Sequence, residues 1–146
     1  MTAEIRPFKA EDLLAFEPRD YEGMSLHERV LMGVKKEKAG PAFTGVVDGK
    51  IIGCAGVGLM WDGVGEAWAV LSHDIELHRL WFHRTARRGL VMLMAAMNLH
   101  RLQASVRIDI ERNCRWLEAF GFVREGIMHG YAPDKTDCVR YALVRG

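Results

Sequence analysis

Several features that define specialised protein classes are missing from this chain of 146 residues. The N-terminus has no apolar core of the signal-peptide type, and nowhere do about 18 apolar residues follow one another as in a membrane-spanning helix. The three cysteines, Cys54, Cys114 and Cys138, share no short metal-binding spacing. The formal net charge of +1 gives no general attraction to nucleic acid. We therefore expect a cytoplasmic protein with no metal site, no membrane partner and no nucleic-acid partner.

What is present is the composition of an ordinary globular domain. Hydrophobic residues make up 49% of the chain and charged residues 27%. A chain of this length can bury one core, and it is too short for two. Internal repeats and low-complexity segments are absent from the sequence. We expect a single domain over residues 1–146.

Turn and capping residues divide the chain into predicted elements. Ser25 and Glu28 form a capping box that begins a helix ending before Gly40-Pro41, and Asp48-Gly49 is a strong signal for a tight hairpin. The predicted strands span residues 4–7, 43–47, 51–60, 66–71 and 102–108, then a strand from 122, and 138–144. The predicted helices span residues 10–16, 25–38, 76–98 and 109–120, the last capped by Asp109.

The predicted long helix carries two kinds of surface. Its Leu, Met and Val residues between 90 and 97 are expected to pack against the sheet. Trp81 and Phe82 are adjacent in sequence and cannot share one helical face, so one of them is expected to be exposed. An exposed aromatic ring would indicate a contact surface.

The C-terminal quarter of the chain carries the most specific pattern. A helix ends at Gly121, whose place after the last apolar position favours a left-handed cap, and a strand begins at Phe122. The motif Leu-Glu-x-x-Gly-Phe-x-x-Glu-Gly is formed by Leu117, Glu118, Gly121, Phe122, Glu125 and Gly126. It resembles the GCN5-related N-acetyltransferase (GNAT) family, most closely its ribosomal-protein acetyltransferase branch.

The resemblance extends to the element order of nearly the whole chain. It implies an α/β (α+β) protein with the GNAT fold, in which about four helices flank a mixed, mostly antiparallel sheet of six to seven strands. The strands before and after the long helix are expected to be parallel. In the family these two strands splay apart, and acetyl-coenzyme A lies between them with its pyrophosphate on the N-terminus of the long helix.

The segment expected to hold the pyrophosphate departs from the family pattern. Relatives have a glycine-rich loop there, whereas residues 66–88 contain no glycine. Asp74 and Glu76 stand where the helix should begin, and carboxylates at that position cap free N–H groups and repel phosphate. If the protein is active, the resemblance assigns contacts with acetyl-coenzyme A to a few positions, namely Leu71, His73, Arg79 and Asn113.

The catalytic positions are also altered. The resemblance suggests Glu66, the only carboxylate on its strand, as the base that accepts the amine proton. Many relatives have a tyrosine that acts as the catalytic acid where this chain has Leu117. They often have an asparagine that contacts the cofactor where this chain has Ile110. Tyr131 and Tyr141 are the remaining phenols near the expected site, and Tyr131 is our candidate for the acid. A solvated Glu66 and tyrosines that only pack remain the alternatives.

Two functions are open at this point. The departures favour a protein of the type found in tailed bacteriophages, which keeps the GNAT fold, has lost or weak catalysis, and binds a virion or assembly partner inside the bacterial host or the virion. The expected contact residues are Arg79, Trp81, Arg84, Arg87 and Arg88, although a solvated outer face would explain the arginines equally. The alternative is an acetyl-coenzyme A-dependent N-acetyltransferase acting on a protein or a small-molecule amine.

Overall fold

The computed structural model describes residues 1–145, and seven strands run through them. They are β1 (Ala3–Pro7), β2 (Ala42–Val47), β3 (Lys50–Trp61), β4 (Val64–Leu71), β5 (Arg101–Arg107), β6 (Val123–Met128) and β7 (Cys138–Val144). In the sheet the order is β1-β2-β3-β4-β5-β7-β6. β4 and β5 pair in parallel, while β1 with β2, β2 with β3, β5 with β7 and β6 with β7 are antiparallel. The predicted strands and the parallel pair across the long helix are confirmed.

Three α-helices and two short 3-10 helices occur in the same residues. They are η1 (Ala10–Leu14), α1 (Leu26–Ala39), η2 (His73–His78), α2 (Arg79–Ala96) and α3 (Glu111–Ala119). The predicted long helix is therefore wrong at its start, because residues 73–78 wind as a 3-10 helix before α2 begins. Asp109 is not the cap of α3 either: Ile110 occupies that position, and Asp109 instead pairs with Arg107 at 3.1 Å.

Contacts gather the chain into two compact units. The first contains Met1–Leu59 and Ala67–Ala86, and the second contains Met60–Glu66 and Arg87–Gly146. β4 and α2 each contribute residues to both units. The single domain over residues 1–146 stays a prediction.

In the first unit, the predicted helix cap and the predicted hairpin turn are both present. The Ser25 hydroxyl accepts a hydrogen bond from the Glu28 N–H at 3.1 Å, which confirms the predicted cap of α1. Asp48 and Gly49 both have positive φ angles, 49° and 79°, as the tight hairpin between β2 and β3 requires. The buried core includes Phe8, Leu13, Cys54 and Val70.

One polar network lies inside the first unit. Asp12 of η1 is only 4% exposed, yet it accepts hydrogen bonds from both terminal nitrogens of Arg6, at 3.1 and 2.9 Å. It also accepts from the Lys9 N–H at 3.0 Å and from the Thr44 hydroxyl at 2.7 Å. Burial acts to raise the pKa of Asp12, but these hydrogen bonds outweigh it and hold that pKa below its ordinary value. The network fastens η1 to β1 and β2.

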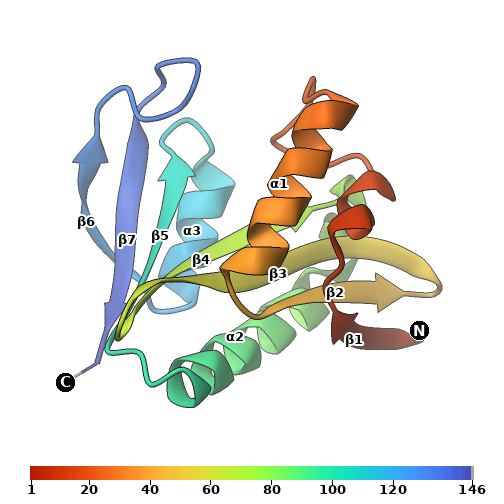
Figure 1. The fold of residues 1–146 in the computed structure, drawn as a ribbon, viewed down its shortest axis with the longest axis horizontal. Helices are drawn as coiled ribbons and strands as arrows, with labels where there is room; N and C mark the ends of the chain where they lie inside the picture. Colours follow the sequence, from red (N-terminus) through yellow and green to blue (C-terminus); the bar gives the residue numbers. More distant parts are fainter. Residues whose placement is uncertain (146) are drawn as a thin grey trace. The chain divides into compact units, whose positions relative to one another are not determined.

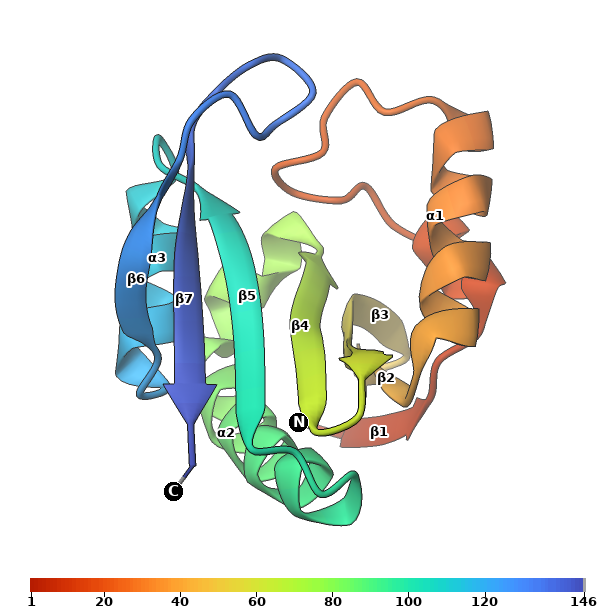
Figure 2. The same cartoon turned by 60° about the vertical axis from the view of Figure 1, so that its left-hand side comes forward.

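In the second unit, β5, β7 and β6 lie side by side with α3 against one face (Figures 1 and 2). That face carries Leu102, Val139 and Tyr141, each completely buried. Gly121 ends α3 with a φ of 96°, which confirms the predicted left-handed cap. The Tyr141 hydroxyl donates a 2.7 Å hydrogen bond to Glu118 Oε2 and so ties β7 to α3.

The outer surface of α2 differs from the prediction. Only Met94 among the apolar residues between 90 and 97 is buried, whereas Val91 and Met92 are 65% and 69% exposed. Trp81 and Phe82 are both half-buried, so the expected exposed aromatic ring is absent from this part of the described chain. A Cβ built on Gly45 would lie 3.3 Å from the Trp81 ring, which shows that the ring packs closely over β2.

Candidate functional site

The turn from β4 into η2, where the pyrophosphate was expected, is closed by its own hydrogen bonds. The Ser72 hydroxyl accepts from the Asp74 N–H at 3.1 Å, and the Ser72 carbonyl accepts from the Ile75 N–H at 3.1 Å. The Ser72 N–H in turn donates to the Ile52 carbonyl at 2.9 Å. The N–H groups of Ser72, Asp74 and Ile75 are therefore already used within the protein.

The two carboxylates of this turn are each compensated by a cation. Glu76 is paired with the buried Arg19 and lies 3.6 Å from Arg79 Nε, and Asp74 lies 3.8 Å from Lys50 Nζ. Their repulsion of an anion is therefore weaker than their sequence positions suggest. The exposed cations at this turn are Lys50 and Arg79, and each has a carboxylate partner. A bound coenzyme A would be held through residues such as Arg79, whose side chain is 65% exposed.

The other predicted cofactor residues have different environments. Leu71 is buried at the end of β4, and a Cβ on Gly53 would lie 2.7 Å from its side chain, so it packs in the core. His73 is exposed, and its Nε2 lies 3.3 Å from Glu22 Oε1. Asn113 lies in the first turn of α3, where its N–H donates to the Ile110 carbonyl at 3.1 Å. Leu71, His73 and Arg79 belong to the first unit, and Asn113 to the second.

Glu66, the predicted base, lies among polar side chains of the second unit. The parallel register puts Glu66 of β4 beside Gln103 of β5, whose amide nitrogen donates to Glu66 Oε2 at 3.4 Å. Arg140 of β7 reaches the same oxygen, with 3.8 Å between its Nη1 and Glu66 Oε2. The Glu66 side chain is 36% exposed, and that of Arg140 is 18% exposed. A carboxylate in this position is both accessible and held in place.

The two candidate phenols are in opposite environments. Tyr131 lies in the turn after β6 and is 54% exposed, and no hydrogen bond or ion pair joins it to Glu66 among the described residues. Tyr141 is completely buried; burial and its hydrogen bonds to Glu118 and Cys114 raise its pKa above the ordinary value. A phenol held this way is structural, which leaves Tyr131 as the accessible one.

The turn that carries Tyr131 is fastened by ion pairs. Arg107 lies 3.0 Å from Asp134 and 3.1 Å from Asp109, and its Nη2 donates to the Thr136 hydroxyl at 3.1 Å. The hydrogen bond with Arg107 lowers the pKa of Asp134 to about 2. The turn between β6 and β7 is therefore held to the end of β5, and the placement of Tyr131 depends on Arg107.

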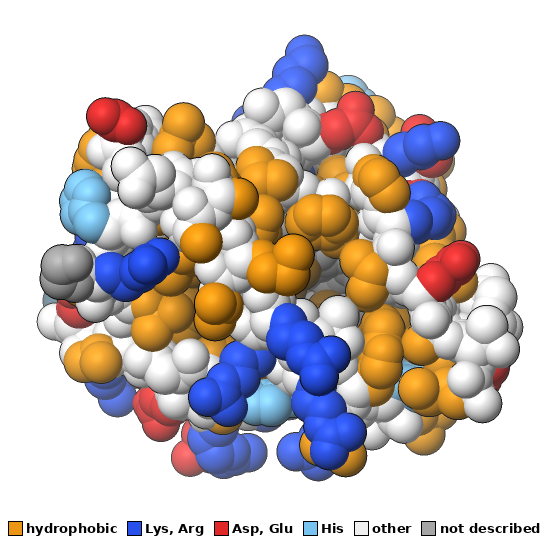
Figure 3. Space-filling view, turned by 90° about the horizontal axis from the view of Figure 1, so that it is seen from below, with side chains coloured by type: hydrophobic (Ala, Val, Ile, Leu, Met, Phe, Trp, Pro, Cys, Tyr) orange, Lys and Arg blue, Asp and Glu red, His pale blue; other side chains and the backbone are white. Residues whose placement is uncertain are grey.

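The arginines expected to bind a partner lie along α2. Arg79, Arg84, Arg87 and Arg88 are all exposed, whereas Trp81 is half-buried. Figure 3 looks at the side of the molecule on which α2 is drawn in Figure 1, and it shows Lys and Arg side chains beside exposed hydrophobic ones. The exposed apolar residues of this helix include Leu80, Val91 and Met92. The arginines of the partner prediction are therefore accessible to solvent, and the partner itself stays a prediction.

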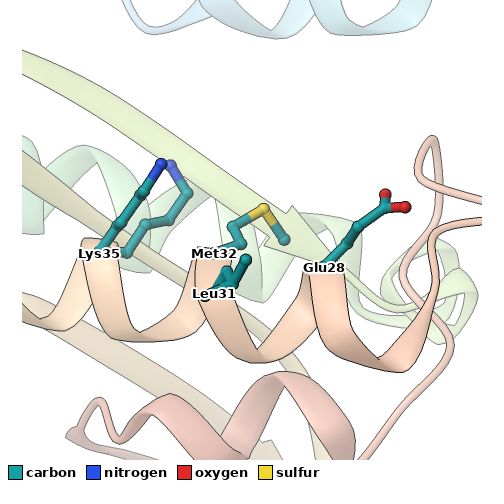
Figure 4. Close-up of a pocket in the computed structure, with 5 residues that line it drawn as sticks. Glu28, Leu31, Met32 and Lys35 are labelled. Carbon is teal, nitrogen blue, oxygen red and sulfur yellow. The ribbon is translucent and has the colours of Figure 1, made fainter.

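A separate hollow of about 350 Å³ lies along α1 (Figure 4). Its lining includes Glu28, Leu31, Met32, Lys35 and Lys36, all from one helix. None of the predicted catalytic or cofactor residues is among them. Among residues 1–145, no group of three or more His, Cys, Asp and Glu side chains could hold a metal ion, and no helix is long and apolar enough to cross a membrane.

Two residues of the Glu66 cluster were not predicted from the sequence, Gln103 and Arg140. A signal for the first was present: in residues 101–107 polar and apolar side chains alternate, which predicts one polar face of a strand. Arg140 could not be found in this way, because its position next to Glu66 depends on the pairing of β7 with β5, and these two strands are separated in the chain by α3 and β6.

Comparison with known proteins gives the fold an independent basis. No model of a known protein family matches the sequence, and no curated protein matches it. Solved structures do match over nearly the full length. Ard1 from Thermoplasma volcanium has a TM-score of 0.80 and 12% identity, and the match covers 100% of this chain and 99% of that one.

Two acetyltransferases match similarly. The ribosomal-protein-S5-alanine acetyltransferase from Vibrio fischeri has a TM-score of 0.69 and 20% identity, over 99% of this chain and 94% of its own. A GNAT-family acetyltransferase from Bacillus anthracis has a TM-score of 0.72 and 18% identity, over 99% and 95%. Sequence identities this low show a shared fold and do not show a shared function. The expected α/β architecture is therefore confirmed: this chain has the GNAT fold.

Proposed function

We propose that the protein is an acetyl-coenzyme A-dependent N-acetyltransferase that acts on an amine. The observation that carries the proposal is the half-buried Glu66 between Gln103 and Arg140, on a chain whose whole length matches acetyltransferases in fold. A fold by itself does not decide a function, so the argument depends on this carboxylate.

The chemistry required of the chain is limited. Acetyl-coenzyme A supplies an acetyl thioester, and transfer replaces its C–S bond with a C–N bond to the amine and releases the thiol. Glu66 accepts the proton that the amine nitrogen loses, directly or through one water. Gln103 orients the carboxylate of Glu66 through its amide nitrogen. Tyr131 is the residue to which this proposal assigns the return of a proton to the leaving sulfur.

The first experiment is calorimetric titration of the protein with acetyl-coenzyme A, with coenzyme A as a companion titrant. Micromolar binding is expected. Arg79→Gln should weaken it, because the turn before α2 offers side-chain cations rather than free N–H groups for the pyrophosphate. Failure to bind at millimolar concentration would reject the enzyme proposal.

Glu66 is tested in a transfer assay that measures the released thiol over a panel of amines. Glu66→Gln should lower kcat by about 10²- to 10⁴-fold, the usual contribution of a general base, and leave the affinity for acetyl-coenzyme A unchanged. Glu111→Gln, an exposed carboxylate of α3, is the matched control and should keep the wild-type rate. An unchanged rate in Glu66→Gln would contradict its role as the base.

The second candidate function is a binding protein of the phage virion or its assembly, with weak or no catalysis. What favours it is the self-capped turn at Ser72 together with the exposed Arg84, Arg87 and Arg88 of α2. The likeness to acetyltransferases makes acetyl transfer the better supported of the two. In the binding case a tagged chain retains a partner protein from an infected extract, and Arg84→Glu with Arg88→Glu releases it.

A further inference from the structure

The second unit has one sheet face that carries polar side chains on adjacent strands. On β5, Gln103 and Ser105 share a face because residues two apart in a strand point to the same side. Across the β5–β7 pair, Ser105 is directly opposite Arg140. Across the β4–β5 pair, Glu66 is opposite Gln103. Four polar groups from three strands therefore meet on this face.

Two atoms of this cluster are buried without a hydrogen-bond partner in the described structure. They are the Nη1 atom of Arg140 and the hydroxyl oxygen of Ser105. The 3.8 Å between Arg140 Nη1 and Glu66 Oε2 makes an ion pair, but it is too long for a hydrogen bond. The other terminal nitrogen of Arg140, Nη2, donates to the weak acceptor Met128 Sδ at 3.5 Å. Among residues 1–145, the Nη1 atom of this guanidinium therefore has an ion-pair partner but no hydrogen-bond acceptor.

A sheet face that only packs would be expected to satisfy these donors or replace them with apolar groups. A buried donor without a partner costs about 1–3 kcal/mol, and more when it is charged. The Arg140 side chain is 18% exposed, but its Nη1 and the Ser105 hydroxyl are buried, so an acceptor from solvent reaches them only when the side chains that cover them move. A planar guanidinium and an adjacent hydroxyl are groups that bind a carboxylate well.

The opposite charges of the cluster define the ligand further. Glu66 attracts a cationic amine, and Arg140 beside it attracts an anion, so together they complement a small zwitterion. A polyamine would put a second positive charge near Arg140. A phosphate dianion would be repelled by Glu66, whereas a carboxylate carries a single charge.

We propose that this cluster recognises an amino acid or a compact amino-acid derivative, whose amine lies against Glu66 and whose carboxylate is bound by Arg140 and Ser105. The inference rests on the proposed function, because it names the substrate class of the same site. Arg140 and Ser105 are then specificity-determining residues, and Glu66 is the group that contacts the reacting nitrogen.

The test uses the full chain and the twenty L-amino acids with their carboxamides, which keep the amine and lose the carboxylate charge. Binding is measured by calorimetry without and with coenzyme A. At least one amino acid should bind about tenfold or more tightly than its carboxamide. Arg140→Gln should remove that preference, and Arg124→Gln, an exposed arginine on the neighbouring strand β6, should leave it unchanged.

A second variant keeps the proposal testable if Arg140→Gln does not fold. Ser105→Ala removes one hydroxyl and should weaken the amino acid severalfold while leaving its carboxamide unaffected. Equal affinity for acids and amides, or no binding of any amino acid at millimolar concentration, would overturn the inference.

The outcomes separate this inference from the proposed function. Transfer of acetyl groups to amines without a carboxylate, at the same rate in wild type and Arg140→Gln, would keep the enzyme and reject the amino-acid site. Amino-acid binding that requires Arg140, in a protein that does not bind acetyl-coenzyme A, would keep the site and reject the enzyme.

Discussion

The buried carboxylate of Asp12 should be the most sensitive polar position in the first unit. It is 4% exposed and accepts hydrogen bonds from Arg6, Lys9 and Thr44, with the shortest, 2.7 Å, from the Thr44 hydroxyl. Asp12→Asn keeps the shape of the side chain, removes its negative charge, and replaces one acceptor oxygen with an NH₂ donor. Its new N–H atoms would then face donors on Arg6, Lys9 or Thr44.

The magnitude follows from the environment of each partner. Removing one member of a fully buried ion pair costs about 3–5 kcal/mol. The Arg6 side chain is 36% exposed, so water can satisfy it after the substitution, and its pairing must be discounted. We expect Asp12→Asn to lower the free energy of unfolding by about 2–3 kcal/mol at neutral pH. Thr44→Val, which removes only one hydrogen bond, should cost about 1–2 kcal/mol.

The measurement is urea unfolding followed by tryptophan fluorescence, since the chain has four tryptophans. Glu11→Gln is the matched control, because Glu11 is the neighbouring carboxylate of η1 and is exposed; it should change stability by less than about 0.5 kcal/mol. A loss in Asp12→Asn no larger than that of the control would refute the argument.

The pH dependence gives a second check on the same residue. The folded pKa of Asp12 lies below its ordinary value of 3.8, so its contribution is fully present above that pH. As the pH falls below 3.8 and through the folded pKa, the carboxylate takes up a proton and the contribution is lost. The difference between wild type and Asp12→Asn should therefore shrink between neutral pH and acid. A constant difference would show that charge is not its cause.

Substitutions at three further positions test the packing, each by the same unfolding measurement. Tyr141→Phe loses the 2.7 Å hydrogen bond to Glu118 and should cost about 1–2 kcal/mol; a cost near zero would mean that water replaces the bond. Gly33→Ala should lower the stability of the protein although alanine favours helices, because the added Cβ would lie 2.7 Å from the Ala10 carbonyl oxygen. A gain in stability would show that η1 can move away from α1. Gly121→Ala should cost about 1–2 kcal/mol from its φ of 96°, and Gly121→Asn should cost less.

Local sequence signals predicted most elements because each depends on a few neighbouring residues. Ser25 capped α1, Asp48-Gly49 formed the hairpin, and Gly121 ended α3 as expected. The segment before α2 was predicted less well. Ser72 caps the turn in a way that also permits a 3-10 helix, so the apolar period alone could not separate η2 from α2.

Which side chains of α2 are exposed could be decided only from the tertiary structure. Trp81 packs against Gly45, a residue whose missing side chain leaves room for the ring, and nothing in the local sequence of α2 indicates that neighbour. Val91 and Met92 are exposed although their residue types favour burial. Burial is decided by what lies opposite a helical face, and the sequence of the helix does not contain that information.

For the candidate site, too, one part follows from the sequence and the other only from the tertiary structure. The sequence determined that Glu66 is the only carboxylate on its strand and that the strand leads to a turn without glycine. Only the tertiary structure decided that Gln103 and Arg140 lie beside Glu66, because the pairings β4–β5 and β5–β7 join segments far apart in the chain. The charge of a residue is fixed by its type, but its partner is fixed by strand register, and register is a property of the whole sheet.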